Sequence, residues 1–332
     1  MTRTLGNSLL IILALVTAVL FGLALHTGPS AINFIDDLQS ILQGQQTLTA
    51  MILTEIRLPR ALLALTVGAT LGIAGAALQG LLRNPLAGPG LVGVSNCAAL
   101  GAVLALYFGL SSLAWFAVPL AGMIGAAISV LLVFMMAGRN GSVMTLLLAG
   151  VAVNAVASSL ISLALNFAPN PYAMSEMVFW LLGSLANRSL ADFYLALPFM
   201  LAGWVFILLG GRFLTALSLG EETAQSLGFH MGRQRALLVI GVALCVGAAV
   251  SVSGNIGFVG LLIPHLLRPL VQYDPGRLLP ASALGGATMV LLADITVQLI
   301  SPNQELKLGV VTALVGGPFF LYLIIKTRNS LL

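Results

Sequence analysis

Long segments without any charged residue constrain this fold more than any other feature of the sequence. Neither acidic nor basic side chains occur in residues 84–138, 140–175 and 278–293. Of the 332 residues, 59% are hydrophobic and only 7% are charged, which is far from the averages of soluble domains. Because a helix of about 20 apolar residues crosses the hydrocarbon core of a bilayer, these segments predict an all-α polytopic membrane protein with no room for a soluble catalytic domain.

Ten apolar segments are predicted to span the membrane. The first is expected to be retained, because its apolar run is too long for a cleaved signal and no small-x-small site follows it. A single helix over 236–267 is the alternative to two spans there, and it would reduce the number to nine. The predicted spans are residues 8–27, 61–82, 91–109, 114–137, 143–166, 192–210, 236–253, 257–268, 279–300 and 308–325.

The placement of basic residues favours ten spans over nine. Ten spans with an inside N-terminus put ten Lys and Arg residues inside and four outside, whereas nine spans divide them seven to seven. Because Lys and Arg concentrate in short cytoplasmic loops, the sequence predicts that both termini are cytoplasmic. The inside set is Arg3, Arg83, Arg139, Arg212, Arg233, Arg235, Arg268, Arg277, Lys326 and Arg328, and the outside set is Arg57, Arg60, Arg188 and Lys307.

The sequence offers no catalytic motif. A P-loop requires Gly before its Lys, but Lys307 follows a Leu and Lys326 follows an Ile. The three histidines lie in different predicted regions, and the two cysteines lack the spacing of a metal site. We therefore expect no catalytic residue, no bound metal and no cofactor in this chain. A net charge of only +4 also disfavours nucleic-acid binding.

Residues 211–235 form the most polar internal loop, on the predicted inner side. Ser218 and Glu221 have the S-x-x-E spacing of a capping box, which predicts a short helix over 219–227. Gly228 suits the left-handed residue that ends such a helix. The segment is either a solvated connection or a docking helix for a cytoplasmic partner.

Three charged residues near the outer side are exceptional. Arg57 and Arg60 precede the span 61–82 against the charge bias, so they either snorkel at the interface or pair with carboxylates of an external protein. Asp294 is the one charged candidate inside a span, and exposure at the interface is its simpler interpretation.

On the inner side, two prolines make residues 83–90 a rigid turn.

Eight ordered motifs are distributed over residues 50–325. They are IRLPRALLAL (56–65), GAALQGLLRNPLAGPGLVGVS (75–95), LLLAGVAVN (146–154), FWLLGSL (179–185), LGEETAQSLG (219–228), SGNIGFVGLLIPHLLR (253–268), DPGRLLPASALGGATMVLLADI (274–295) and LGVVTALVGGPFFLYLI (308–324). In this order they resemble the FecCD family of ABC importer permeases, which carry iron–siderophore complexes, haem or cobalamin across the bacterial inner membrane.

The resemblance implies one transmembrane permease domain over residues 1–332, with the type II ABC importer permease fold. It implies a multi-pass homodimer in the bacterial inner membrane, a cytoplasmic ABC ATPase dimer that holds ATP and Mg²⁺, and a periplasmic substrate-binding protein. Transport of an iron chelate, a siderophore complex or haem, by alternating access is the leading function. A cobalamin importer is the alternative within the family, and a passive channel or secondary transporter is the rival from another class.

The resemblance also implies roles for particular residues. Gln298 stands where the family commonly has an arginine and Lys307 where it commonly has a proline, so docking is expected to use a changed set of charges, and compensation of Gln298 by Lys307 is one alternative. The expected roles are ATPase coupling for Ser218, Glu221, Glu222, Ala224, Leu227 and Gly228 of the coupling-helix loop 211–235; binding-protein docking for Arg57, Arg60 and Lys307; a cytoplasmic gate at Asn84 and Leu86; and a periplasmic gate at Trp180, Gly183 and Ser184 within segment 167–190.

Overall fold

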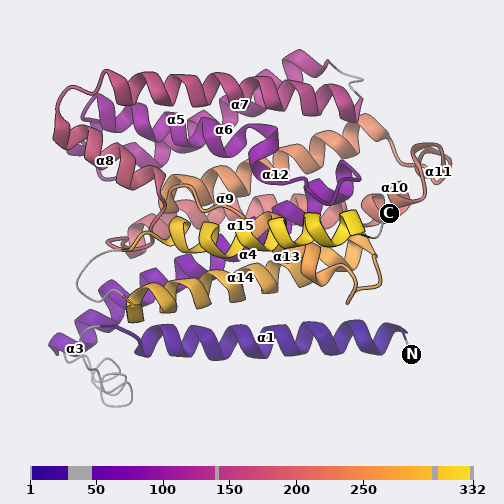
Figure 1. Ribbon diagram of the computed structural model, residues 1–332, viewed down its shortest axis with the longest axis horizontal. Helices are drawn as coiled ribbons and strands as arrows, with labels where there is room; N and C mark the ends of the chain where they lie inside the picture. The colour runs from indigo at the N-terminus through magenta and orange to yellow at the C-terminus, as the bar shows by residue number, and fades with distance from the viewer. Residues whose placement is uncertain (1, 29–46, 139–141, 301–305, 330–332) are drawn as a thin grey trace.

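The protein is a bundle of helices that lie side by side along one common direction (Figure 1). The computed structural model describes residues 2–28, 47–138, 142–300 and 306–329, and all regular structure within these ranges is helical. The predicted all-α class is therefore confirmed. Each of the predicted spans corresponds to one helix: α1 (Thr2–His26), α4 (Leu58–Leu81), α5 (Val94–Tyr107), α6 (Ala117–Ala137), α7 (Val143–Asn166), α9 (Leu190–Leu209), α12 (Met231–Ser253), α13 (Val259–Leu267), α14 (Pro275–Ile300) and α15 (Leu308–Asn329).

Shorter helices connect the long ones. A π-helical segment, Ile52–Arg57, joins α3 to α4, so the helical path into the bundle begins before the predicted span. The segment predicted as the periplasmic gate contains a separate helix, α8, which the sequence did not indicate. The short elements are α3 (Leu48–Met51), α8 (Pro171–Leu181), α10 (Gly211–Ser218), α11 (Glu221–Ser226) and the 3-10 turns Pro89–Val92 and Leu110–Ser112.

The number of membrane crossings is supported only in part by helix length. Among the described residues, seven helices are long and apolar enough to cross a membrane, whereas α5 and α15 are apolar over shorter lengths and α13 has nine residues. The single helix over 236–267 is wrong, because Gly254 (φ 69°) ends α12 and Phe258 (φ 67°) precedes α13. The chain is a multi-pass membrane protein, and the number ten stays a prediction.

The two ends of the bundle carry different segments. Figure 1 places the start of α1, the end of α15, α10 and α11 at one end, and α3 and α8 at the other. This is the arrangement expected if both termini and the loop 211–235 share one side of the membrane. Of the residues that predicted this side, Arg139 lies outside the described residues, and so do the side chains of Arg3, Lys326 and Arg328.

The centre of the bundle is α4, which packs very closely against α14 and α13. A Cβ atom added at Gly68 or Gly72 would overlap the main-chain carbonyl of Gly286 or Ser282, both on α14. A Cβ atom at Gly75 would likewise overlap a main-chain carbonyl of α13. Small residues let helix backbones approach this closely, and the resulting van der Waals contact favours helix association in lipid, where no hydrophobic force acts between helices.

Candidate functional site

A cavity of about 360 Å³ lies among α4, α5, α7 and α13. Its walls include the 3-10 turn Pro89–Val92 on one side and the loop between α12 and α13 on another. None of the described side chains that line it is charged. Its polar lining residues are Ser95, Asn96, Asn154 and Asn255.

The asparagines give this cavity neutral hydrogen-bonding groups. The Nδ2 atom of Asn96 on α5 donates a hydrogen bond of 2.9 Å to the hydroxyl of Ser158 on α7. The Oδ1 atom of Asn154 is buried and accepts no hydrogen bond from the described residues. Because buried acceptors are usually satisfied, this oxygen can accept a hydrogen bond from water or a bound molecule. The cavity can therefore form hydrogen bonds with a polar molecule without any charged contact from these lining residues.

The turn after α4 forms one boundary of the cavity. Leu86 is exposed and lines the cavity. Asn84 instead shapes the turn, because its Oδ1 atom accepts a hydrogen bond of 2.9 Å from the main-chain N–H of Leu86. The structure brings these two predicted cytoplasmic-gate residues together, and their gating role stays a prediction.

The turn is anchored by a buried glutamine that the sequence analysis missed. Gln79 of α4 donates through Nε2 to the carbonyl of Leu261 at 3.2 Å and accepts through Oε1 from Nη2 of Arg268 at 2.6 Å. Its main-chain carbonyl accepts from the N–H of Asn84 at 3.2 Å. Gln79 therefore connects α4, both ends of α13 and the turn. A glutamine within the long uncharged part of a predicted span is the signal that could have identified it.

The predicted periplasmic-gate residues lie where three segments meet. Trp180 is buried near the end of α8. Gly183 follows with φ +73°, a backbone conformation that residues other than glycine rarely adopt. The N–H of Ser184 donates to the carbonyl of Ser253 at 2.8 Å, and the N–H of Gly309 donates to the carbonyl of Gly183 at 3.4 Å. The segment after α8 is therefore fastened to the end of α12 and the start of α15.

This junction also touches the cavity wall. A Cβ atom on Gly183 would lie 2.6 Å from the carbonyl oxygen of Asn255, one of the residues that line the cavity. A movement of segment 167–190 would therefore move the wall of the cavity. The structure brings Trp180, Gly183 and Ser184 together, although their role as a gate stays a prediction.

The loop 211–235 contains two helices rather than one. The predicted capping box is wrong, because Ser218 ends α10 and its hydroxyl donates to the carbonyl of Thr215 at 2.7 Å. Gly220, with φ +117°, is the residue before α11, and no side chain caps that helix. Gly228 has φ +89°, as predicted for the left-handed stop. A helix over 211–218 was not expected. Ser218, which the sequence assigned to the N-cap of the next helix, is instead the last residue of this one.

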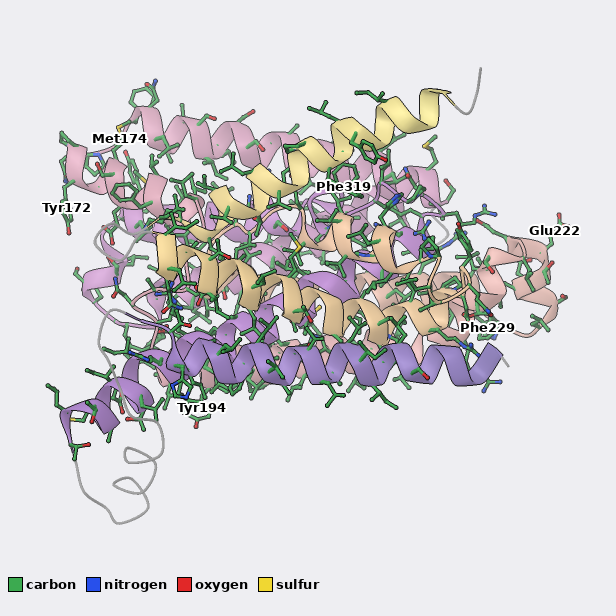
Figure 2. All side chains as sticks on the ribbon, turned by 60° about the horizontal axis from the view of Figure 1, so that its bottom comes forward. Tyr172, Met174, Tyr194, Glu222, Phe229 and Phe319 are labelled. Atoms are coloured by element: carbon green, nitrogen blue, oxygen red, sulfur yellow. The ribbon has the colours of Figure 1, made fainter. Side chains whose placement is uncertain are left out.

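The predicted coupling residues have different surroundings. Glu222 and Leu227 are exposed, and Figure 2 shows Glu222 at the opposite end of the molecule from Tyr172. Ala224 is buried, so it packs inside the loop. Glu221 pairs with two arginines: its Oε2 atom lies 2.8 Å from Nη2 of Arg235, and its Oε1 atom lies 3.9 Å from Nη2 of Arg83. A partner at this end would therefore meet Glu222 and Leu227 directly.

Arg57 is engaged inside the chain. Its side chain is 5% exposed, and Nη1 donates to the carbonyl oxygens of Leu25 at 3.1 Å and His26 at 2.6 Å. Snorkelling at the interface is therefore the wrong interpretation of Arg57. A cation at these carbonyls is favourable, because they carry the negative end of the α1 dipole.

Arg60 forms a bidentate pair with Asp294. Its Nε atom lies 3.0 Å from both carboxylate oxygens, and Nη2 lies 2.9 Å from Oδ1. Gln298 donates a further hydrogen bond of 2.8 Å to Oδ2 of Asp294. Asp294 is 1% exposed, so interfacial exposure is the wrong interpretation of this residue. Its burial follows from the pair, because a buried carboxylate requires a cation and hydrogen bonds.

Lys307 at the head of α15 has a different environment. Its Nζ atom lies 5.3 Å from the ring centroid of Phe179 on α8, within the range of a cation–π contact.

The other two predicted docking residues make contacts inside the chain: Arg57 joins the start of α4 to α1, and Arg60 joins α4 to α14. Binding-protein docking by the three residues stays a prediction.

Comparisons with known proteins place this geometry in a family. The chain matches the FecCD transport family over residues 14–326. It is 41% identical over 284 residues to the uncharacterized ABC transporter permease protein YvrB of Bacillus subtilis (strain 168), covering 84% of this chain and 80% of that protein. It is 39% identical over 275 residues to the vitamin B12 import system permease protein BtuC of Salmonella paratyphi A, covering 83% and 84%.

Two further similarities agree. The hemin transport system permease protein HmuU of Yersinia pestis is 38% identical over 279 residues, with 83% of each chain covered. A solved inward-facing structure of an ABC transporter assigned to the metal-chelate type has a TM-score of 0.84 and 32% identity, covering 97% of this chain and 99% of that one. The fold is therefore that of an ABC transporter permease, and the chain belongs to the FecCD transport family.

Proposed function

We propose that this chain is the membrane-spanning permease subunit of an ATP-driven importer that moves an iron chelate, a siderophore complex or haem, from the periplasm to the cytoplasm. The observation that carries the proposal is the uncharged cavity between the turn at Leu86 and the loop at Asn255. The relatives named for vitamin B12 and hemin transport support the class of cargo.

The working unit is a homodimer in the bacterial inner membrane. An ABC ATPase dimer, which carries ATP and Mg²⁺, docks against α10 and α11, and a periplasmic binding protein docks at the opposite end. Exposed Glu222 and Leu227 are the residues of α11 and its end that suit contact with an ATPase. This chain itself has no catalytic role in the proposal.

The chemistry of the cavity suits a passage rather than a store. The chelate arrives complete from its binding protein, so the passage need not supply metal ligands. Neutral amides and apolar side chains make weak contacts, and a transport path must bind its cargo weakly enough to release it. ATP binding and hydrolysis on the partner would move α10 and α11 and switch the cavity from outward-open to inward-open.

Reconstitution tests this proposal directly. The permease, its ATPase and its binding protein are placed in proteoliposomes, and uptake of haem and of a ferric siderophore is measured with and without internal ATP. ATP-dependent accumulation of either cargo is expected. Equal uptake without nucleotide would identify a passive channel, and uptake driven by an ion gradient alone would identify a secondary transporter.

Cobalamin is the second candidate cargo. The 39% identity to a vitamin B12 import permease favours it, and the amide-lined cavity suits a corrin whose periphery carries amides. Cyanocobalamin is therefore measured in the same vesicles. Accumulation of cyanocobalamin without accumulation of either iron chelate would assign the importer to cobalamin and overturn the iron-chelate proposal.

A further inference from the structure

The carboxylate of Glu221 is shared between two elements that are far apart in the sequence. Oε2 lies 2.8 Å from Nη2 of Arg235, near the start of α12, and Oε1 lies 3.9 Å from Nη2 of Arg83, in the turn after α4. Glu221 is itself the first residue of α11. One side chain thus joins the proposed coupling helix both to the bundle and to the turn that bounds the cavity.

The two ion pairs differ in strength. Arg235 is 9% exposed and its Nη2 atom lies 2.8 Å from Glu221, although this close ion pair lacks hydrogen-bond alignment and Glu221 is 38% exposed. The attraction in this pair is stronger because the charges are closer and less screened by water. Arg83 is 52% exposed and its pair is long, which is the class of ion pair that contributes least. The Arg235 pair therefore fixes Glu221 to α12, while the Arg83 pair can form and break with small displacements.

Arg83 is placed to pass such a displacement to the cavity. It has φ +49° and directly precedes Asn84, whose side chain holds the main chain of Leu86. Leu86 lines the cavity. Gln79 holds the turn to α4 and α13, because it bonds the main chain of Asn84 and the carbonyl of Leu261. A displacement of the Arg83 guanidinium would therefore be passed to the short segment from Arg83 to Leu86.

We propose that the Arg83–Glu221 pair is the link through which movement of α11 opens and closes the turn at Leu86, with Arg83 as a positioning residue for the gate. This inference rests on the proposed function, because it takes the partner ATPase as the source of the movement. It assigns Glu221 an internal role and leaves direct ATPase contact to its exposed neighbours.

The first test measures the amount of cargo moved per ATP hydrolysed in proteoliposomes that contain the complete importer. Arg83→Gln should lower this ratio by about threefold to fivefold, the upper part of the range measured for a partly exposed ion pair. Glu221→Gln should lower it at least as much, because it also removes the pair with Arg235. The double variant should be no worse than the poorer single variant, because each single variant already removes the Arg83–Glu221 pair. Arg83→Lys, which keeps the charge, should restore most of the ratio.

The matched control is Arg233→Gln. Arg233 is an exposed arginine on α12, two residues from Arg235, and no ion pair joins it to a described residue. This variant should transport like the unmodified protein. A wild-type ratio in Arg83→Gln, or effects that multiply in the double variant, would overturn the link. Loss of ATPase co-purification with an unchanged ratio would also overturn it, because Arg83 would then act in docking.

A second measurement needs neither transport nor ATPase, so it separates failure of the link from failure of the proposed function. Spin labels are attached to Leu86→Cys and Glu222→Cys in the permease alone, where the native Cys97 and Cys245 are buried. The distribution of label distances should be narrow, and it should broaden with Arg83→Gln but not with Arg233→Gln. An equally narrow distribution in Arg83→Gln would show that no link exists.

Discussion

At the residue scale, the charged side chains near the start of α4 hold the bundle together at the end that carries α3 and α8. Arg57 caps the carbonyl end of α1, and Arg60 is bound to Asp294 on α14. Charge inside a membrane protein is costly unless it is paired. These contacts are therefore expected to contribute to stability, whether or not a binding protein also uses the same surface.

Removing Arg60 should destabilise the protein more than removing Asp294. Arg60→Gln leaves the carboxylate of Asp294, which is 1% exposed, with Gln298 as its remaining described side-chain partner. The free energy of unfolding should fall by about 3 kcal/mol, the low end for breaking a buried pair. Asp294→Asn leaves an arginine that is 19% exposed and can reach water, at a cost of about 1 kcal/mol. Thermal unfolding in detergent checks this order.

The double variant provides the control for this pair. Arg60→Gln with Asp294→Asn should be more stable than Arg60→Gln alone, because no buried charge is left without a cation. Glu176→Gln, at an exposed carboxylate of α8, should leave the unfolding temperature unchanged. If Arg60→Gln unfolds at the same temperature as Glu176→Gln, the pair contributes no stability.

Single-residue expectations from sequence marked exceptional positions but did not identify their partners within the chain. The charge pattern correctly marked Arg57 and Arg60 as exceptional, but it placed Asp294 at an exposed interface. The partners Arg60 and Asp294 are 234 residues apart, and helical periodicity says which face a residue shares, not which distant residue meets it. Gln79 was missed for the same reason, since its partners lie 182 and 189 residues further on.

At the element scale, the close approach of α4 and α14 depends on glycine. A methyl group at Gly72 would overlap the carbonyl of Ser282, which is main chain and cannot rotate away. Gly72→Ala should therefore push the two helices apart and cost about 1–3 kcal/mol, the usual range for overpacking. The measurement is the unfolding temperature in detergent, together with the yield of folded protein.

Gly22 on α1 is the matched control for this substitution. It is exposed, and a Cβ atom placed there meets no atom within 4 Å. Gly22→Ala should leave the unfolding temperature unchanged or raise it slightly, because alanine favours a helix over glycine. Equal stability of Gly72→Ala and Gly22→Ala would mean that α4 and α14 do not need the close contact.

Helix positions were predicted well where the apolar pattern is long, and poorly where the helix is short. Each predicted span has its helix. The capping box at Ser218 failed because α10 runs up to that serine and uses its hydroxyl. Short helices such as α8 and α10 are set by contacts with the bundle, and such contacts carry little local sequence signal.

At the scale of the whole molecule, the cavity is connected to both ends of the bundle. One connection runs from α11 through Glu221 and Arg83 to the turn at Leu86, and the other from α8 through Gly183 to Asn255. A transporter needs such connections, because an ATPase at one end and a binding protein at the other must change access to the same cavity. The resemblance supplied the gate residues, and the contacts between them required the fold.

A charge placed in this cavity should discriminate between cargoes. Asn154→Asp puts a carboxylate among neutral lining residues with little change of volume. Two like charges about 10 Å apart at an effective dielectric constant of about 20 repel by about 1.7 kcal/mol, which is more than a tenfold change in an equilibrium constant. ATP-driven uptake of haem, whose two carboxylates are anionic, should therefore fall about tenfold at neutral pH.

Asn154→Leu separates charge from the loss of the amide. It removes the hydrogen-bonding group at similar size, so it should lower haem uptake by much less than Asn154→Asp. Uptake measured as the external pH falls toward the ordinary pKa of aspartate should recover in Asn154→Asp but not in Asn154→Leu, because protonation removes the added charge. If the two variants transport haem equally at neutral pH, an anionic cargo does not pass Asn154, and the path must lie outside this cavity.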